Sequence, residues 1–403
     1  MKQIFTNLKL VDTESSEVII ANNALVVEDG RVVELTTKPG HGETRSLEGC
    51  FVLPGLIDSH VHLVWEGQPD PNRYTITDST ATTAYRAARS AWWNLSGGVT
   101  TVRDVGGTDG IAIALAKAVR EGLVPGCRIV AAGRPIAQTG GHVHTMSREA
   151  DGPEEVRKAV REQVKAGAAV IKLMCSGGAY TEGESIHATQ FSLEEIRAAT
   201  REAKVTEKRV AAHALSEAAI DNCLQGGVDT IEHAALLSEK NIAAFKKTGA
   251  FMVPTIAPYF IMATRGKENG VPDYAVQKSV QVMQHYFDSL KKAASQGVNI
   301  ALGTDAGSPQ LAHPTVPYEA WLWQHEAGLD ALTILRAATT GSALALGRDR
   351  ELGRLAPGFL ADFVLYADNP LEDLDALQFP KAVFKAGQQV AEASTIWSEF
   401  LTG

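Results

Sequence analysis

Two histidines separated by a single residue, His60 and His62, are the first residues whose types and spacing could do chemistry. Side chains two positions apart in an extended strand point to the same face, so the two imidazoles would lie side by side. Such a pair is suited to holding a metal ion. An isolated pair is equally compatible with two unrelated histidines on a surface strand, so its interpretation depends on where later polar residues fall.

Four more polar residues stand in or just after short apolar runs further along the chain: Lys172, His213, His233 and Asp305. In a parallel α/β barrel the carboxyl ends of the strands meet at one mouth, where the chemistry is done. Each residue also has an ordinary alternative, because a lone strand-end histidine is more often a hydrogen-bonded core or rim residue, and Asp305 could cap a turn. Six such positions in register with a barrel repeat argue against coincidence, and we predict that they converge on one site.

Lys172 is the most informative of these residues, because it falls inside the apolar run 170–174. An unpaired ammonium group in such a strand is costly, and it usually loses its charge or finds a partner. A neutral lysine can react with carbon dioxide to form a carbamate, an anionic oxygen ligand that can bridge two metal ions. Lys172 is therefore a candidate bridging ligand.

The elements needed to position these residues are visible in the sequence. From Gly55 onward, short apolar runs alternate with helix-type segments, the pattern of βα units around a parallel sheet. Ser192 and Glu195 have capping-box spacing and predict a helix to about residue 204, while glycines at 167, 226–227 and 297 stand where helices should end. The eight predicted strands are the one carrying His60 and residues 100–103, 128–132, 169–174, 209–213, 230–233, 250–254 and 299–304. We predict an α/β protein built on a (β/α)8 TIM barrel.

Short β-type runs flank this region on both sides. Residues 3–11, 18–27 and 31–35 form the first group, with a turn at Asp29 and Gly30. After Gly347 the β-type texture returns at residues 353–355, 361–366, 381–385 and 388–391. The simplest arrangement pairs both groups in one small β-sandwich domain, residues 1–54 with 351–403, and leaves residues 55–350 as the barrel.

Composition limits the classes of partner. The chain has 403 residues, of which 45% are hydrophobic, and its 38 basic and 47 acidic residues give a net charge of −9. This balance gives no electrostatic footprint for nucleic acid or an anionic membrane, so small molecules or dipeptides are the expected partners. The four cysteines are scattered in apolar surroundings, and no leader or long apolar span is visible. We therefore expect reduced thiols and a cytoplasmic protein.

The sequence resembles the amidohydrolase superfamily, specifically its binuclear-metal members with a carboxylated bridging lysine. The motifs that carry the resemblance span nearly the whole chain: residues 53–62, 98–104, the Lys172 run with 176–178 after it, 212–214, 232–234, 303–307, 353–362 and 369–371. Within the superfamily the chain is most similar to bacterial metal-dependent prolidases and Xaa-Arg or Xaa-Lys dipeptidases.

The resemblance implies a role for each candidate residue. His60 and His62 with Asp305 would hold the more buried metal, His213 and His233 the more exposed one, and N6-carboxylated Lys172 with a hydroxide would bridge the two ions, most simply zinc. The bridging hydroxide would attack an amide carbonyl, and catalytic Asp305 would pass the proton to the leaving amine. The expected activity is therefore metal-dependent hydrolysis of dipeptides or N-acyl amino acids. We also expect a homo-oligomer.

Residues on the substrate side are also suggested by the resemblance. His142, in the glycine-rich segment 140–144, would contact the substrate carbonyl or carboxylate and so act as a second catalytic residue, and His144 is either a further contact or a neighbouring loop histidine. Tyr259 could supply a hydroxyl or pack on the rim. Leu215 stands where relatives commonly carry an aromatic residue or a histidine, which leaves the carboxylate anchor unassigned. The charged side chains of the mouth loop 180–188, Glu184 among them, could be specificity determinants or solvated, and we expect them to be solvated.

Two alternatives remain open. The same centre could hydrolyse an ester, a lactone or a cyclic amide, because binuclear sites process several electrophiles. The chain could also be a non-catalytic scaffold on the same barrel. Loss of metal ligands would mark a scaffold, and none of the expected ligands is lost.

Overall fold

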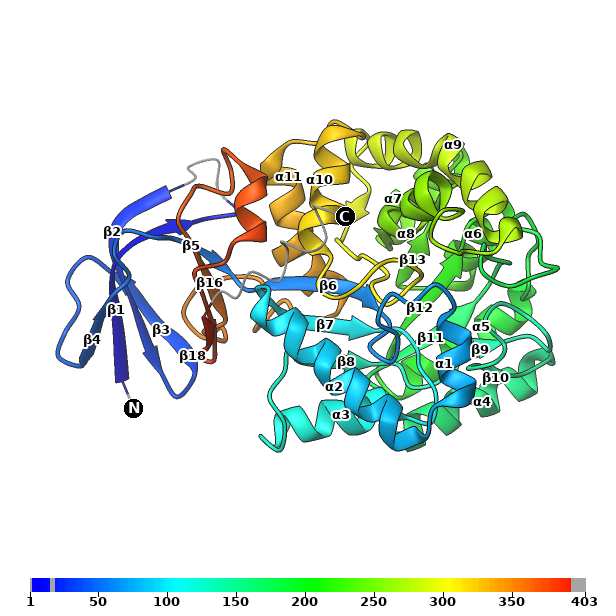
Figure 1. Ribbon diagram of the computed structural model, residues 1–403, viewed down its shortest axis with the longest axis horizontal. Helices are drawn as coiled ribbons and strands as arrows, with labels where there is room; N and C mark the ends of the chain where they lie inside the picture. Colours follow the sequence, from blue (N-terminus) through cyan, green and yellow to red (C-terminus); the bar gives the residue numbers. More distant parts are fainter. Residues whose placement is uncertain (1, 15–18, 393–403) are drawn as a thin grey trace.

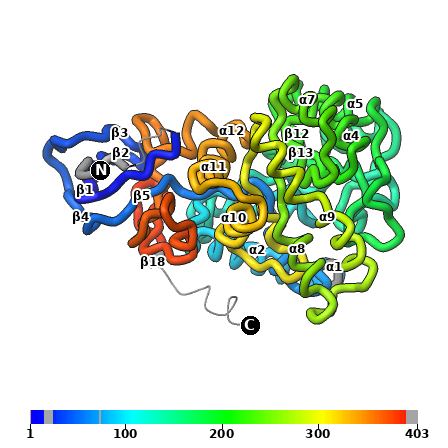
Figure 2. Tube along the Cα trace, turned by 90° about the horizontal axis from the view of Figure 1, so that it is seen from above, coloured from blue at the N-terminus to red at the C-terminus, as the bar shows by residue number. Residues whose placement is uncertain are grey.

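A computed structural model describes residues 2–14 and 19–392 of the chain. The described residues form a barrel of parallel strands surrounded by helices, with a mixed sheet at one end of the elongated molecule (Figure 1). The N-terminal segment and the C-terminal described segment lie together in that sheet in two perpendicular views (Figure 2). The predicted fold class, a TIM barrel with a β-sandwich domain built from both ends of the chain, is confirmed.

The mixed sheet contains eight strands in the order β18-β17-β16-β5-β1-β2-β3, with β4 paired to β1. Its core includes three phenylalanines, Phe5, Phe363 and Phe384, whose ring centroids lie 4.4 to 5.3 Å apart. Asp29 and Gly30 form the predicted turn between β2 and β3, both with positive φ. The strands are β1 (Lys2–Val11), β2 (Ile19–Glu28), β3 (Arg31–Thr36), β4 (Glu43–Ser46), β5 (Phe51–Pro54), β16 (Phe363–Tyr366), β17 (Ala382–Lys385) and β18 (Gln388–Glu392).

The barrel strands are parallel and pair in chain order. They are β6 (Leu56–Val61), β7 (Val99–Asp104), β8 (Arg128–Ala131), β11 (Val170–Met174), β12 (Arg209–Ala214), β13 (Thr230–His233), β14 (Phe251–Val253) and β15 (Asn299–Ile300). The Ala169 N–H donates to Ala131 O at 2.8 Å and joins β8 to β11. The Ser59 N–H donates to Leu302 O at 2.9 Å and closes the circle. Two short strands, β9 (Ile136–Ala137) and β10 (Arg148–Glu149), follow β8. β9 pairs with β11, and β10 pairs with β9.

Several helices begin or end at residues whose capping chemistry the sequence predicts. Ser192 and Glu195 form the capping box of α5, and Gly167 and Gly227 end α4 and α6 in the left-handed conformation. No helix in the described part of the chain is long and apolar enough to cross a membrane. The α-helices are α1 (Pro71–Thr77), α2 (Thr80–Ser96), α3 (Ile111–Arg120), α4 (Gly152–Ala166), α5 (Leu193–Val205), α6 (Glu217–Gly226), α7 (Glu239–Thr248), α8 (Ile256–Arg265), α9 (Asp273–Ser295), α10 (Val316–His325), α11 (Ala331–Arg336) and α12 (Ser342–Ala345). A π-helical turn, η1 (Ala337–Gly341), and a 3-10 helix, η2 (Leu374–Gln378), complete the set.

Two predicted strands differ from the structure. The last barrel strand, predicted over 299–304, forms a regular ladder only in β15, because the Leu302 N–H donates to Ala337 O of η1. Residues 353–355 are an irregular loop, because Gly353 has a φ of 86° and approaches the carbonyl of Thr339. Residue 18, the predicted start of the second strand, and residues 393–403 lie outside the described residues.

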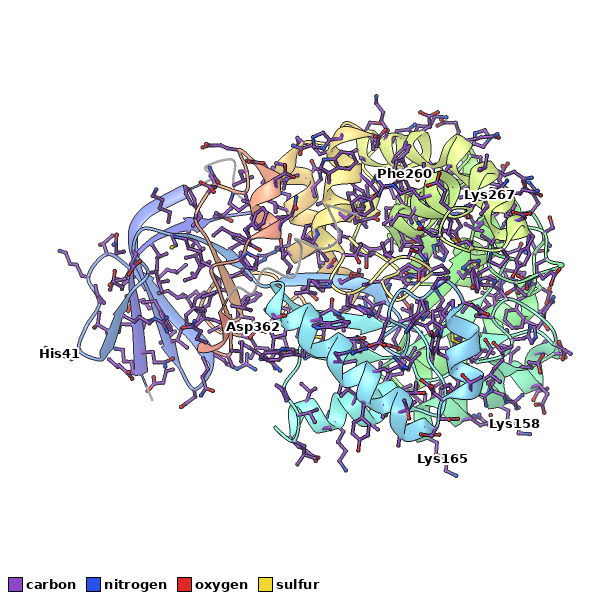
Figure 3. The ribbon with its side chains drawn as sticks, in the orientation of Figure 1. His41, Lys158, Lys165, Phe260, Lys267 and Asp362 are labelled. Carbon is purple, nitrogen blue, oxygen red and sulfur yellow. The ribbon has the colours of Figure 1, made fainter. Side chains whose placement is uncertain are left out.

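The mixed sheet is joined to the barrel by specific polar contacts. The Arg128 guanidinium donates two hydrogen bonds to the carboxylate of Asp362, at 2.9 and 3.2 Å, and Lys385 Nζ donates to Gly126 O at 2.6 Å. Asp362 lies where the two parts of the molecule meet (Figure 3). The proposed division at residues 54–55 and 350–351 stays a prediction.

Candidate metal centre

A cavity opens at the carboxyl ends of the barrel strands. It contains about 530 Å³ of space not filled by protein atoms, part of it open to solvent. All six residues predicted as metal ligands line it, and so do His142 and Tyr259. The lining residues are His60, His62, Trp65, His142, Val143, Met146, Lys172, Met174, Ala179, Tyr180, His213, His233, Pro258, Tyr259, Met262, Asp305, Ser308 and Pro309. The structure therefore brings together residues that lie far apart in the sequence, such as His60 and Asp305, which are 245 positions apart.

His60, His62 and Asp305 form a compact buried group whose ligand atoms all lie within 4.8 Å of one another. Asp305 Oδ1 lies 3.6 Å from His60 Nε2 and 3.3 Å from His62 Nε2. The other ring nitrogens are engaged elsewhere, since His60 Nδ1 is 2.7 Å from Glu232 Oε2 and His62 Nδ1 is 2.7 Å from Gly106 O. Two imidazole Nε2 atoms and one carboxylate oxygen therefore face a common point.

The backbone holds this group in place at some conformational cost. Asp305 and His233 have φ angles of 58° and 72°, in the left-handed region that side-chain-bearing residues seldom occupy. Asp58, on the ligand strand β6, accepts hydrogen bonds from both the backbone N–H and the hydroxyl of Thr304, at 3.1 and 2.6 Å. This contact ties the His60 strand to the segment that carries Asp305. Unusual backbone at several ligand positions is a feature typical of functional sites.

Burial keeps His60, His213 and His233 neutral, whereas at His62 burial is outweighed by the contact with Asp305, which raises the pKa of the imidazole. Burial lowers the pKa of His60 and of His213 well below the usual value, and it lowers the pKa of His233 to about 3. A neutral imidazole has a free lone pair and is the form that binds metal. Burial alone would raise the pKa of Asp305, but His60 and His62 outweigh it and hold the pKa below its usual range. The neutral imidazoles and the ionised Asp305 are therefore ready to bind a cation, and His62 releases its proton when it binds one.

His213 and His233 form the second half of the cluster. Their ring centroids lie 4.5 Å apart, and the His233 ring lies 5.2 Å from that of His60. His233 Nδ1 is fixed 2.6 Å from Thr255 Oγ1, while His213 Nε2 is 3.3 Å from Gly177 O. Both imidazoles line the same cavity as the His60 group.

Lys172, on β11, lines the same cavity as both halves, with only 1% of its surface exposed. Burial lowers the pKa of its ammonium group to about 8, although nearby Glu232 opposes the shift. The amine is therefore much easier to deprotonate than an exposed lysine, as carbamate formation requires.

A buried ion pair supports the first half of the cluster, and the sequence analysis did not assign it a role. Glu232 receives a hydrogen bond from Arg103 Nη2 at 2.8 Å through Oε1, and its Oε2 contacts His60 Nδ1. Arg103 also donates to Ser59 O and to Thr230 Oγ1, at 2.6 and 2.8 Å. Carboxylates behind a ligand histidine fix its tautomer and orientation. The sequence feature that could have indicated this pair is that Arg103 and Glu232 are charged residues inside apolar strands.

The geometry of the first group fits a metal ion. Asp305 Oδ1 is buried and receives no well-aligned hydrogen bond from any described residue. A buried acceptor without a partner is rare and unfavourable. A divalent cation held by two imidazoles and this oxygen would satisfy it, which is the donor chemistry that zinc and similar ions prefer.

The expectation that the mouth-loop charges are solvated is wrong for Glu184. Its side chain is 9% exposed, and its Oε2 lies 3.0 Å from Nδ1 of His142. Burial by itself would raise the pKa of Glu184, but the hydrogen bond from His142 helps to lower it below the usual value. Glu182 and His187 are exposed, as expected. The sequence could not reveal this difference, because it depends on how the loop folds back over His142.

The other predicted substrate residues lie in different surroundings. His144 is exposed, and the cavity lining does not include it, which gives no support to a substrate contact. The Tyr259 ring is buried, 5.7 Å from the His233 ring. Leu215 is fully buried in the hydrophobic core and does not reach the cavity.

Apolar side chains form much of the remaining cavity wall, and the sequence analysis did not single them out. Met146, Met174, Met262 and Trp65 all line it. A single methionine in an apolar run is normally a core residue, so no sequence signal separated these from the core. Of the described lining residues, Lys172 is the only lysine, and none is an arginine.

Comparisons with known proteins agree with this geometry. Residues 51–390 match the Amidohydrolase family. An ochratoxinase of Aspergillus niger is 31% identical over 401 residues, which cover 90% of this chain and 81% of that protein. The structure of a Xaa-Pro dipeptidase with methionine bound in its active site superposes with a TM-score of 0.90 at 30% identity, covering 97% of this chain and 100% of that chain. A prolidase in complex with N-methylphosphonate-L-proline gives a TM-score of 0.89 at 33% identity, with the same two coverages.

Proposed function

This chain belongs to the amidohydrolase family and is a metal-dependent hydrolase of carbon–nitrogen bonds, and we propose that its substrate is a small amino-acid derivative, a dipeptide or an N-acyl amino acid. The observation that carries the proposal is the buried group of His60, His62 and Asp305 that lines the cavity at the mouth of the barrel. Two structural relatives at 30% and 33% identity hold methionine and a phosphonate analogue containing proline, which supports an amino-acid-like substrate.

The proposed site holds two divalent ions, most simply zinc. His60, His62 and Asp305 would bind one ion, His213 and His233 the other, and N6-carboxylated Lys172 would bridge them. The three neutral imidazoles of His60, His213 and His233, in the same cavity as the buried Lys172 amine, support this assignment. When bound, the ions would lower the pKa of a water molecule and polarise the substrate carbonyl.

Asp305 is the residue of this chain that moves the proton. Its carboxylate accepts a proton from the attacking water as the water oxygen bonds to the carbonyl carbon. It then gives that proton to the amine nitrogen as the carbon–nitrogen bond breaks, so the products are a carboxylic acid and an amine. The lowered pKa keeps Asp305 ionised before the attack. His142, whose ring centroid lies 4.3 Å from that of His213, would contact the substrate carbonyl or carboxylate.

The cavity wall favours an apolar substrate side chain. Met146, Met174 and Met262 can adapt to apolar groups of different shapes. A cationic Xaa-Arg or Xaa-Lys side chain would find no carboxylate among the described lining residues other than Asp305. We therefore place proline and other apolar residues ahead of arginine and lysine as the preferred substrate residues.

A substrate panel tests this proposal directly. The panel contains Xaa-Pro, Xaa-Arg and Xaa-Lys dipeptides, N-acyl derivatives of apolar amino acids, and matching esters and lactones. The expected result is the highest kcat/KM on amides of proline or other apolar residues, with no turnover by metal-free protein. Hydrolysis of esters or lactones alone would contradict the amide proposal. A preference for Xaa-Arg or Xaa-Lys would contradict only the apolar assignment.

A further inference from the structure

The loop of residues 176–190 covers one side of the cavity and is held in place at several points. Ser176 and Thr189 pair across its base, and Ala179 and Tyr180 line the cavity. Lys278 Nζ on α9 donates to Thr181 O at 2.7 Å and to Gly178 O at 3.3 Å. The hydroxyl of Tyr180 donates to Pro69 O at 2.7 Å. The loop is therefore anchored to the barrel on both sides.

Glu184 is the centre of a closed ring of hydrogen bonds inside this loop. Its Oε1 accepts from Gln190 Nε2 at 2.8 Å, while Oε2 accepts from the Gly178 N–H at 3.1 Å. Gln190 Oε1 in turn accepts from the backbone N–H of His142 at 2.9 Å. His142 Nδ1, 3.0 Å from Glu184 Oε2, completes the ring. The carboxylate thus contacts the His142 side chain directly, and its partner Gln190 contacts the His142 backbone.

The same ring of hydrogen bonds fixes the Nδ1 edge of the His142 imidazole. The Gly178 N–H and His142 Nδ1 both contact Glu184 Oε2, and because an ionised carboxylate can only accept, Nδ1 must carry the hydrogen of this contact. Thr181 Oγ1 lies 3.2 Å from the same nitrogen and can accept from it as well. Nε2 has no hydrogen-bond partner among the described residues and is the nitrogen left for a substrate. Gly178 packs tightly against the ring, since a Cβ atom at this position would lie 2.1 Å from His142 Cε1.

From these contacts we infer that Glu184 is a positioning residue for substrate recognition. It holds the His142 ring in one orientation and one tautomer, with Nε2 available to the substrate, and it acts through His142 instead of touching the substrate itself. This inference rests on the proposed function, in which His142 contacts the substrate. It assigns the covering loop a purpose beyond shielding the cavity.

Glu184→Gln tests the inference with little change in shape. If the NH2 group of the glutamine replaces Oε1, it faces another donor, Gln190 Nε2. If it replaces Oε2, it faces the donors Gly178 N–H and His142 Nδ1. In either case the ring of hydrogen bonds cannot close as before. We expect kcat/KM on the best amide substrate to fall by about 10- to 100-fold, the size of effect that displacing a catalytic contact produces. Glu182→Gln, a change at an exposed carboxylate of the same loop, is the matched control and should leave kcat/KM unchanged.

A double variant separates positioning from a general structural role. In a His142→Ala background, Glu184→Gln should have no further effect on kcat/KM, because there is no imidazole left for Glu184 to position. Nitrogen-15 NMR of histidine-labelled protein gives a readout independent of turnover. The His142 imidazole signals, identified by their absence in His142→Ala, should move in Glu184→Gln and stay in place in Glu182→Gln.

The possible results distinguish the inference from the proposed function. If His142→Ala lowers kcat/KM and the two changes are additive, or if the imidazole signals of His142 do not move, the positioning role is wrong while amide hydrolysis stands. If His142→Ala leaves kcat/KM unchanged, His142 makes no substrate contact, and the inference is wrong for that reason. Absence of amide hydrolysis by the unmodified protein would overturn the proposed function itself.

Discussion

Asp305 Oδ1 is a buried carboxylate oxygen to which no described residue donates a well-aligned hydrogen bond. Leaving such an acceptor without a partner costs about 1–3 kcal/mol, and more when the group is charged. Asp305 carries this unfavourable oxygen although its backbone is also in the left-handed conformation. The Nε2 atoms of two imidazoles lie close to the same oxygen. A bound cation explains this combination, and packing offers no comparable explanation.

Asp305→Asn is expected to reduce turnover by about 100- to 10,000-fold, because the amide keeps the shape of the side chain but cannot accept the proton. The measurement is kcat on the best substrate, with metal content by elemental analysis and the melting temperature to show that the fold survives. Asp368→Asn, at an exposed carboxylate, is the control. Retained turnover in Asp305→Asn would show that another group is the base.

The sequence was informative about residues at strand ends and uninformative about the residues behind them. His60, His213 and His233 were found because each falls at the end of an apolar run, a position that the barrel repeat makes meaningful. Arg103 and Glu232 are 129 residues apart, and only the closed barrel shows that they pair. Glu184 was misjudged for a similar reason, since His142, the side chain over which its loop folds, comes from a different loop.

At the scale of elements, the apolar runs predicted the strands well where a strand pairs on both sides. The prediction failed where a neighbouring element replaces the ladder, as η1 does at Leu302. The helix α8 illustrates a different limit. Its N-cap residue, Thr255, makes no capping hydrogen bond, because its hydroxyl contacts His233 Nδ1. Glu319 of α10 accepts from Ile256 N at 2.9 Å and from Ala257 N at 2.8 Å instead, a cap that no local sequence pattern contains.

Glu319→Gln should therefore weaken the start of α8, the helix that carries Tyr259. Oε1 accepts from Ile256 N and Trp323 Nε1 while Oε2 accepts from Ala257 N, so a glutamine must point its amide N–H at another N–H group. We expect a loss of about 1–3 kcal/mol in the free energy of unfolding, measured as a lower midpoint in urea. Glu326→Gln, at the exposed end of α10, should change stability by less than about 0.5 kcal/mol. Equal midpoints for the two variants would show that the cap is unimportant.

At the scale of the whole molecule, the mixed sheet and the metal centre share one stretch of chain. β5 passes through Gly55 directly into β6, which carries His60. The Gly55 N–H donates to Asp362 O at 2.9 Å, and a Cβ at this glycine would lie 2.1 Å from Thr100 Oγ1. The small sheet therefore fixes the point at which the strand that carries His60 begins.

Assembly of the complete centre is the most demanding prediction, because it depends on a modification of Lys172. A lysine cation beside two divalent ions would repel both, whereas a carbamate adds a negative charge and two bridging oxygens. Purified protein should carry about two divalent ions per chain and lose activity on chelation. Metal-free protein prepared in degassed buffer should regain activity slowly with zinc alone and faster when bicarbonate is added.

Lys172→Ala provides the control for this prediction, because it removes the amine and leaves the imidazoles in place. This variant should be nearly inactive, should not respond to bicarbonate, and should recover part of its activity with a short carboxylic acid that fills the gap left by the carbamate. Mass spectrometry at neutral pH and a crystal structure of the active protein would identify the group at Lys172 directly. Electron density that ends at Nζ in a fully active crystal with both ions bound would refute the carbamate, and bicarbonate-independent recovery would point to the same conclusion.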